Sequence, residues 1–130
     1  MIHDIQGLRV LLVEDDPDSR EIFELLLRHH GAEVRAEPCA ADALNALRRQ
    51  DFDVLLSDIQ MPGQDGCELL RRVRMFDQDL PALALTGCTS SLDQERAFEA
   101  GFDAHVSKPV SAGRLVAALV KVCGERATPS

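Results

Sequence analysis

The stretch GLRVLLVEDDPDSREIFELLLRHHG, residues 7–31, contains the pattern that decides the fold. Its residues 8–13, LRVLLV, are apolar apart from Arg9 and β-branched enough for a strand that is buried in a sheet. Asp16 is a candidate N-cap, Pro17 stands at the first helical position, and Gly31 is a stop signal, so a helix is predicted between them. This helix is expected to bury an apolar face formed by Ile22, Phe23, Leu26 and Leu27. The stretch therefore predicts a strand followed directly by a helix.

The same strand-then-helix pattern repeats along the rest of the chain. Further strands are predicted at residues 32–37, 52–58, 81–86 and 103–109. Further helices are predicted at residues 39–50, 66–76, 90–101 and 111–124, with Phe76 among the apolar residues of the second of these. Five alternating units favour a parallel sheet that is covered by helices on both faces, and right-handed crossovers then favour a doubly wound α/β fold. In such sheets the site lies outside the carboxyl ends of the strands.

Composition limits the class of protein. The chain has 130 residues, of which 45% are hydrophobic, enough for one domain with its own core. We expect this domain to span residues 7–124 and a flexible tail to span 125–130. The net charge of −8 argues against direct nucleic-acid binding, which needs a basic surface. No membrane span or secretion signal is visible and no cysteines form a Cys-x-x-Cys pair, so we expect a cytoplasmic protein that does not bind membranes.

Chemically active side chains stand at the predicted carboxyl ends of four strands. Glu14 and Asp15 follow the first strand, Asp58 ends the third, Thr86 ends the fourth, and Lys108 follows the fifth. A doubly wound sheet brings these ends to one edge, so the side chains should converge. Clustered carboxylates need a cation or a raised pKa to coexist, and an all-oxygen site that awaits a phosphate suits Mg²⁺. The sequence therefore predicts a site for a phosphoryl group.

Asp58 is the central residue of this prediction. It is the second residue of the stretch SDIQMPGQDG, residues 57–66, and alone it could be no more than an acid that caps a turn. Because Lys108, Thr86 and the acidic pair stand in register with it, we interpret it as a carboxylate nucleophile. The Met-Pro-Gly turn that follows would fix the backbone so that a carbonyl can reach the metal.

Four pieces of the chain together resemble the receiver domain of two-component response regulators. They are VLLVEDDPDSR, DVLLSDIQMPGQDG, PALALTG and FDAHVSKP, and they occur in the family's order and spacing. Each piece is weak evidence alone, and the four together are specific. The resemblance covers the chain from Gly7 to Gly124. It implies a flavodoxin-like (βα)₅ sandwich of three layers, whose five-stranded parallel sheet has the order 2-1-3-4-5.

The resemblance also implies a metal site and a phospho-acceptor. Asp58 would accept the phosphoryl group and contact the metal. Asp15 would bind Mg²⁺ directly, Glu14 would act through a water, and the backbone carbonyl of Gln60 would complete the set. Mn²⁺ would substitute for Mg²⁺.

Other implied roles concern the phosphoryl oxygens and the output. Thr86 and Lys108 would contact the phosphoryl oxygens, and the Lys108–Pro109 peptide would be cis, which aims the lysine. Thr86 would also act as a switch together with His105, which stands where many relatives carry an aromatic residue. Whether His105 has this switch role or only packs is left open by the sequence, and histidine can also titrate.

The implied function is phosphoryl transfer from a phosphohistidine to Asp58, followed by a change in the surface formed by the fourth helix, fifth strand and fifth helix. Such a domain catalyses its own phosphorylation and dephosphorylation without being a conventional turnover enzyme. Its partner would be a histidine kinase or a histidine phosphotransfer domain, and it would be a monomer or a weak homodimer.

Three alternatives accompany this interpretation. The first is a receiver-like interaction module that does not depend on phosphorylation. The second is an aspartyl-nucleophile phosphohydrolase, which would want an Asp where Gln60 stands. The third concerns the whole protein: no effector domain is expected after the last helix, so the chain is either a single-domain regulator or a piece of a larger protein. The stretches GLRVLLVEDDPDSRE and AGFDAHVSKPVSAGRLVAAL resemble the receiver domains at the C-terminus of hybrid sensor kinases.

Overall fold

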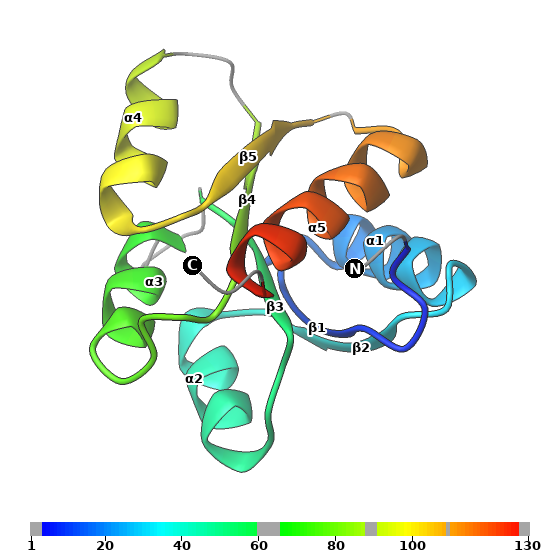
Figure 1. Ribbon diagram of the computed structural model, residues 1–130, viewed down its shortest axis with the longest axis horizontal. Helices are drawn as coiled ribbons and strands as arrows, with labels where there is room; N and C mark the ends of the chain where they lie inside the picture. The colour runs from blue at the N-terminus through cyan, green and yellow to red at the C-terminus, as the bar shows by residue number, and fades with distance from the viewer. Residues whose placement is uncertain (1–3, 60–65, 88–90, 109, 128–130) are drawn as a thin grey trace.

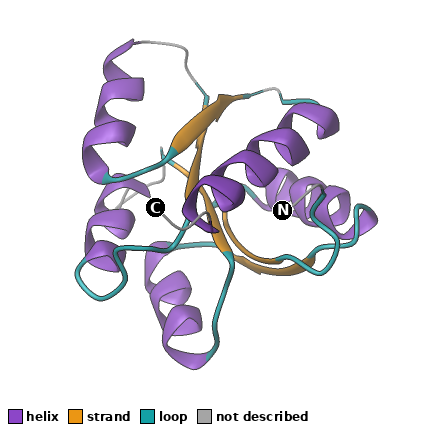
Figure 2. Cartoon of the chain, in the orientation of Figure 1, coloured by secondary structure: helices purple, strands orange, loops and turns teal. Residues whose placement is uncertain are grey.

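The fold was analysed in a computed structural model that describes residues 4–59, 66–87, 91–108 and 110–127. In this part of the chain five strands alternate with five helices (Figures 1 and 2). The strands are β1 (Arg9–Val13), β2 (Glu33–Glu37), β3 (Val54–Asp58), β4 (Ala82–Thr86) and β5 (Ala104–Ser107). The helices are α1 (Pro17–His29), α2 (Ala40–Arg49), α3 (Gly66–Arg74), α4 (Ser91–Ala100) and α5 (Ala112–Ala127).

The five strands form one parallel sheet in the order β2-β1-β3-β4-β5, which confirms the predicted flavodoxin-like topology. One apolar cluster joins the sheet to α2, α3 and α4, and a second joins it to α1 and α5. Figure 1 shows these two groups of helices on opposite sides of the sheet. The predicted three layers are therefore present, and β1, β3 and β4 are almost wholly buried between them.

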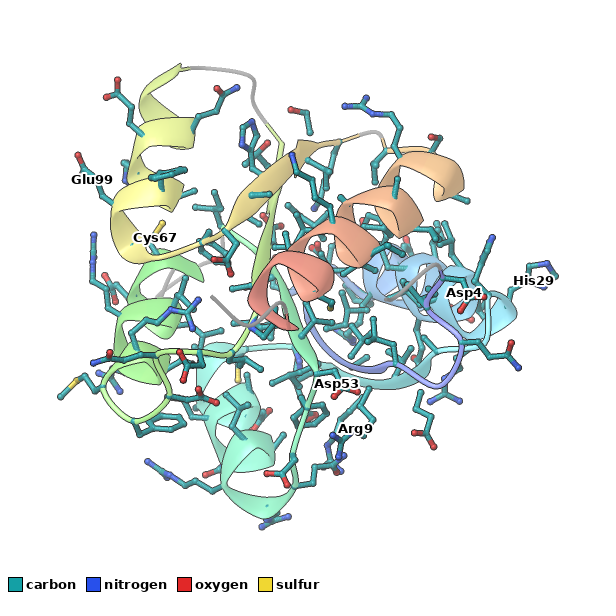
Figure 3. The ribbon with its side chains drawn as sticks, in the orientation of Figure 1. Asp4, Arg9, His29, Asp53, Cys67 and Glu99 are labelled. Atoms are coloured by element: carbon teal, nitrogen blue, oxygen red, sulfur yellow. The ribbon has the colours of Figure 1, made fainter. Side chains whose placement is uncertain are left out.

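An ion pair fixes β1 against β3 at the amino-terminal end of the sheet. Arg9 Nη2 lies 3.1 Å from Asp53 Oδ1, and the Arg9 backbone N–H donates to Asp53 Oδ2 at 2.8 Å (Figure 3). In the resulting register Val10 pairs with Val54 and Val13 with Ser57. The next residues along both strands, Glu14 and Asp58, therefore emerge at the same edge of the sheet.

The start and end of α1 follow the sequence signals. The Asp16 carboxylate accepts a hydrogen bond from the Ser19 backbone N–H at 2.9 Å, and this bond lowers the pKa of Asp16. Pro17 is the first helical residue, where its missing N–H leaves no helical bond unmade. Gly31, just after the helix, has a φ of 91°, a conformation that favours glycine.

Two side chains that were predicted to be buried are exposed. Ile22 is 62% exposed, because α1 packs on the sheet through Phe23 and Leu27 and turns Ile22 toward the rim of that contact. Phe76 is 57% exposed, because α3 ends at Arg74 and the helical spacing no longer sets its direction. Helix α5 also continues to Ala127, so residues 125–127, which were expected in the loose tail, are helical. Among the described residues, no helix has the length and the apolar character that crossing a membrane requires.

These exposures predict different stabilities for two truncations on α1. Leu27→Ala should lower the free energy of unfolding by about 2–5 kcal/mol, because Leu27 is fully buried and its loss leaves a cavity. Ile22→Ala should change it by less than about 0.5 kcal/mol, as surface substitutions do. Urea unfolding followed by circular dichroism measures both values. Equal losses in the two variants would mean that α1 packs through the wider face predicted from the sequence.

Candidate functional site

Four of the predicted site residues converge at the carboxyl ends of β1, β3 and β5. Glu14 and Asp15 follow β1, Asp58 is the last residue of β3, and Lys108 follows β5. Carboxylate oxygens of Glu14, Asp15 and Asp58 all lie within 4.8 Å of one another. Residues that are up to 94 positions apart in the chain therefore form one cluster.

Lys108 connects two of these carboxylates. Its Nζ donates to Glu14 Oε2 at 2.8 Å and to Asp58 Oδ2 at 3.0 Å. Burial opposes the charged ammonium, but the hydrogen bonds to Glu14 and Asp58 and their negative charges outweigh this and raise the pKa of Lys108. The lysine is therefore held as a fixed cation beside Asp58.

The surroundings of Glu14 disfavour the charged form of its carboxyl group. Its side chain is 1% exposed, and burial raises the pKa of its carboxyl above the ordinary value. The hydrogen bond from Lys108 lowers this pKa and the nearby Asp58 carboxylate raises it again. One ammonium thus compensates only part of the negative charge of the cluster, and a second cation would stabilise it further.

The donor set fits a hard divalent cation. Glu14, Asp15 and Asp58 offer only carboxylate oxygens, which are the ligands that Mg²⁺ prefers. Asp15 is partly exposed at the mouth of the cluster, so an ion bound there could keep waters or meet a phosphate. The cluster and Lys108 together can therefore stabilise negative charge that develops on a transferred phosphoryl group.

The backbone at Asp58 is tightly enclosed. The Ser57 hydroxyl donates to the Asp58 carbonyl at 2.9 Å, and the Gly66 N–H donates to the carbonyl of Ile59 at 2.8 Å. A Cβ atom added at Gly66 would lie 2.2 Å from the Asp58 carbonyl oxygen, a distance that side chains do not adopt. Gly66 therefore allows α3 to start directly against the backbone of Asp58.

Thr86 lies at the same edge but is directed toward β5. It is buried, and its hydroxyl donates to the Val106 carbonyl at 3.3 Å and lies 3.4 Å from Ser107 Oγ. His105 is exposed on β5 and pairs with Ala84 in the sheet. Their switch role stays a prediction.

Two further predictions fall outside the described residues. The Gln60 carbonyl, with the Met-Pro-Gly turn after it, belongs to residues 60–65, and the Lys108–Pro109 peptide involves residue 109. The proposed metal contact and the cis peptide therefore also stay predictions.

Sequence reasoning missed two residues that shape the site. One is Gly66, which was predicted only as the end of a turn and the start of a helix, and whose close approach to the Asp58 backbone had no signal in the sequence. The other is Arg20, whose Nη1 donates to the Glu14 carbonyl at 3.0 Å and lies 3.4 Å from that of Asp15. No sequence signal indicated that the Arg20 side chain returns to the loop before its helix.

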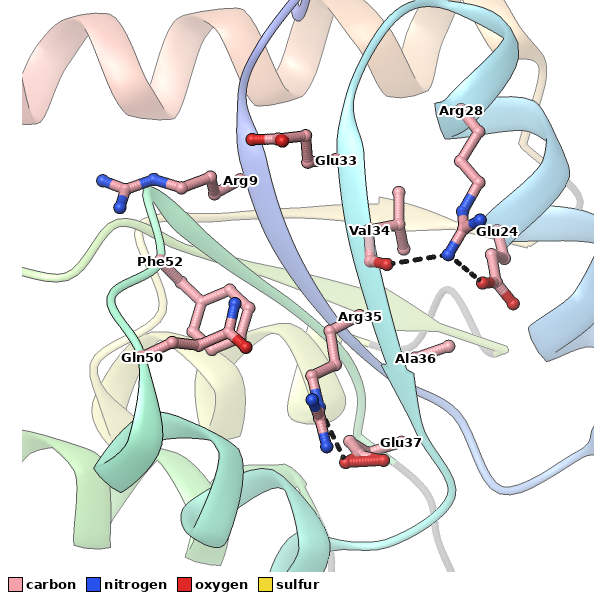
Figure 4. Close-up of a pocket in the computed structure, with 10 residues that line it drawn as sticks. All are labelled: Arg9, Glu24, Arg28, Glu33, Val34, Arg35, Ala36, Glu37, Gln50 and Phe52. Atoms are coloured by element: carbon pink, nitrogen blue, oxygen red, sulfur yellow. Dashed lines mark hydrogen bonds and ion pairs between the residues drawn. The ribbon is translucent and has the colours of Figure 1, made fainter.

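Two grooves among the described residues lie outside the acid cluster, one away from it and one next to it. Figure 4 shows a groove of about 620 Å³ along the edge strand β2, where Arg28 Nη2 donates to the Val34 carbonyl at 3.1 Å. Ion pairs between arginine and glutamate line this groove, and none of the cluster residues borders it. A smaller apolar groove is lined by Ser19, Ile22, Phe23, Leu26, Lys108 and Val110. It shares Lys108 with the acid cluster, so it opens directly beside the site.

Comparison with known proteins adds independent evidence. Residues 10–120 match the response regulator receiver domain family. The chain is 33% identical over 121 residues to the sensor protein GacS of Pseudomonas syringae pv. syringae, covering 89% of this chain and 13% of GacS. It is 38% identical over 120 residues to the transcriptional regulatory protein AfsQ1 of Streptomyces coelicolor, covering 90% of this chain and 52% of AfsQ1. The chain thus spans only part of these curated relatives.

A solved structure with the same fold contains a metal. It is the receiver domain of the sensor histidine kinase PA1611 from Pseudomonas aeruginosa PAO1, with a magnesium ion coordinated in its active-site cleft. The TM-score is 0.84 at 30% sequence identity, and the alignment covers 91% of this chain and 98% of that one.

The enclosure of Asp58 predicts the effect of a single methyl group. Gly66→Ala should lower the free energy of unfolding by about 1–3 kcal/mol, because the new Cβ must displace the Asp58 backbone or the start of α3. Gly113→Ala is the matched control, since nothing lies within 4 Å of a Cβ at that helical position. That control should be neutral or stabilising by up to about 1 kcal/mol. Urea unfolding measures the free energy of unfolding of both variants. An unchanged value for Gly66→Ala would contradict the close contact with the Asp58 backbone.

Proposed function

The chain belongs to the response regulator receiver domain family of two-component signalling, and on this premise we propose that Asp58 accepts a phosphoryl group from a phosphohistidine. The observation that carries the proposal is the position of Lys108 Nζ, 2.8 Å from Glu14 and 3.0 Å from Asp58, within a cluster of three carboxylates. This arrangement supplies a nucleophile, a fixed cation and a cation-binding site at one point. The proposed protein donors are histidine kinases and histidine phosphotransfer domains, which carry such a phosphohistidine.

In the proposed reaction an Asp58 carboxylate oxygen attacks the phosphorus in line with the leaving histidine nitrogen. The new O–P bond forms as the P–N bond breaks, and the electron pair stays on the imidazole, which takes up a proton from solvent. Lys108 is already 3.0 Å from Asp58 Oδ2, so it can follow the oxygens of the incoming group without a large movement. Glu14, Asp15 and Asp58 would hold Mg²⁺, or Mn²⁺ in its place, which neutralises negative charge on the phosphoryl oxygens when bound.

Thr86 would link the modified Asp58 to β5. Its hydroxyl now donates to the Val106 carbonyl, and a phosphoryl oxygen on Asp58 is a stronger, charged acceptor. Turning toward that acceptor would release β5 beside His105. The proposed output is a shift in the population of conformations of the surface formed by α4, β5 and α5.

The donor would bind the apolar groove beside Lys108. Exposed Ile22 and partly buried Leu26 and Val110 form its apolar lining, and Lys108 belongs to both the groove and the site. A segment that carries a phosphohistidine between apolar side chains would therefore reach Asp58 from this side. Leu25, also on α1 and equally exposed, does not line the groove.

The nucleophile is tested by incubating the protein with a small acyl-phosphate donor and Mg²⁺ and measuring its intact mass at neutral pH. The unmodified sequence should gain one labile phosphoryl group, and the gain should disappear with a chelator or with Asp58→Asn. Asp16→Asn is the matched control: it stands two residues from Glu14 and caps α1, and asparagine caps as well as aspartate. That variant should be phosphorylated like the original chain.

Two outcomes of this experiment would contradict the proposal. Addition that survives Asp58→Asn would identify another acceptor. No addition to the unmodified chain, from either the small donor or a phosphohistidine domain, would favour a receiver-like interaction module that does not use phosphorylation.

The groove is tested with two charged substitutions on α1. Ile22→Asp should slow transfer from a phosphohistidine-bearing kinase or phosphotransfer domain about tenfold or more, because it places a carboxylate in the apolar contact. Leu25→Asp should leave that rate within about twofold. Both variants should react normally with the small acyl-phosphate donor, which needs no protein contact. Donors are first selected from a panel by their transfer to the unmodified chain, and equal rates for the two variants would remove the groove from the donor interface.

A further inference from the structure

Arg20 connects α1 with the acidic loop that precedes it. It lies in the first turns of the helix, where its backbone N–H donates to the Asp16 carbonyl at 2.9 Å. Its side chain turns back, so that Nη1 donates to the Glu14 carbonyl at 3.0 Å and lies 3.4 Å from the Asp15 carbonyl. A single guanidinium thus holds two successive peptide groups of the loop.

The two carbonyls are those of Glu14 and Asp15, whose side chains supply two of the three carboxylates of the cluster. The two planar peptide groups flank the Cα atom of Asp15, and the first of them also follows the Cα atom of Glu14. Holding both groups therefore restricts the directions in which these two side chains leave the backbone. The loop has other restraints, since the Glu14 N–H donates to the Glu37 carbonyl at 3.1 Å and the Asp16 N–H donates to Glu14 Oε1 at 3.3 Å. Among these three restraints, Arg20 is the one that reaches both carbonyls.

We infer that Arg20 is a positioning residue, which holds the loop so that Glu14 and Asp15 face Asp58 and thereby sets the affinity for the divalent cation. This inference rests on the proposed function, because it concerns the same cation site. Partners that orient metal ligands from behind typically account for about 10- to 100-fold in metal affinity. Arg20 would act on the backbone of the ligands, where other groups share the task, so the lower end of that range is expected.

The charge of Arg20 would act in the opposite direction. A guanidinium near the cluster repels a divalent cation, so removal of the charge alone would tighten binding. Removal of the positioning would weaken it. The direction of the change in affinity therefore separates the two roles.

The experiment is a calorimetric titration of the unphosphorylated full chain with Mg²⁺ alone. Arg20→Gln should raise the dissociation constant about tenfold. Arg20→Lys keeps the charge and a flexible ammonium that can still donate to a loop carbonyl, so it should raise the constant by less. Arg28→Gln is the matched control, because Arg28 is on the same helix and also donates to a backbone carbonyl, that of Val34, away from the cluster. Its dissociation constant should equal that of the unmodified chain.

A second readout separates positioning from general damage. The rate of phosphorylation by the small acyl-phosphate donor is measured against Mg²⁺ concentration. Arg20→Gln should need more Mg²⁺ for half its maximal rate, while the maximal rate stays within about threefold of the original. If Arg20→Gln does not fold, as judged by circular dichroism, the same comparison is made with Arg20→Lys.

Unchanged or tighter Mg²⁺ binding in the variants would overturn the inference. If the unmodified chain binds Mg²⁺ and is phosphorylated in that case, the proposed function stands and only the role of Arg20 fails. If the unmodified chain binds no Mg²⁺, the metal part of the proposed function fails and the inference fails with it.

Discussion

The arrangement of the site depends on one electrostatic constraint: three carboxylates lie close together, and a single ammonium is hydrogen-bonded to two of them. Glu14, Asp15 and Asp58 would repel one another if they were gathered without a cation, and Glu14 is too buried for water to screen it. Lys108 relieves this repulsion through its contacts with Glu14 and Asp58. It can do so only because β5 ends beside them, on the same edge of the sheet as β1 and β3. The strand order of the sheet therefore determines which charged groups meet at the site.

Close packing of the backbone is the second requirement. Asp58 ends a strand that is buried along its whole length, and its carbonyl lies against Ser57 and Gly66. On the β1 side, Arg20 holds the carbonyls of Glu14 and Asp15 in a comparable way. The carboxylates thus extend from backbone segments whose carbonyls are fixed by hydrogen bonds and close packing. Such preorganisation matters because electrostatic stabilisation is largest when the dipoles and charges need not rearrange during the reaction.

Much of this could be predicted from the sequence, for identifiable reasons. The mostly apolar stretch of residues 8–13, the cap at Asp16 and the stop at Gly31 are local signals, and the structure confirms them. The convergence of Asp58 and Lys108 followed from topology, since the carboxyl ends of parallel strands meet at one edge. Burial was predicted less well. Ile22 and Phe76 fit an apolar helical spacing, but which part of a wide apolar face meets the sheet depends on how the helix docks and where it ends.

Contacts between a long side chain and distant backbone could not be predicted at all. An arginine such as Arg20 has many rotamers, and nothing in its neighbours in the sequence indicates that it returns to the loop before its helix. The role of Gly66 is equally dependent on tertiary structure, because its constraint is the Asp58 carbonyl and not an unusual φ angle of its own. Both residues act on the backbone that carries the carboxylates, whereas the sequence pattern identified only the side chains that do the chemistry.

Thr86 shows how far one hydrogen bond can drive the proposed switch. Its bond to the Val106 carbonyl is between neutral groups, and such bonds contribute about 1 kcal/mol net, whereas a bond to a charged acceptor contributes about 1.5–3 kcal/mol. Exchange of one for the other would therefore favour the turned state by about 1 kcal/mol, less than tenfold in population. A shift from 1:99 to 99:1 needs about 5.5 kcal/mol. Thr86 alone would thus not produce so complete a shift, which would need other groups that also change partners at Asp58. Lys108 is the strongest candidate, since a phosphoryl group would compete with Glu14 for its ammonium and so draw on the same ion pairs that hold the site together.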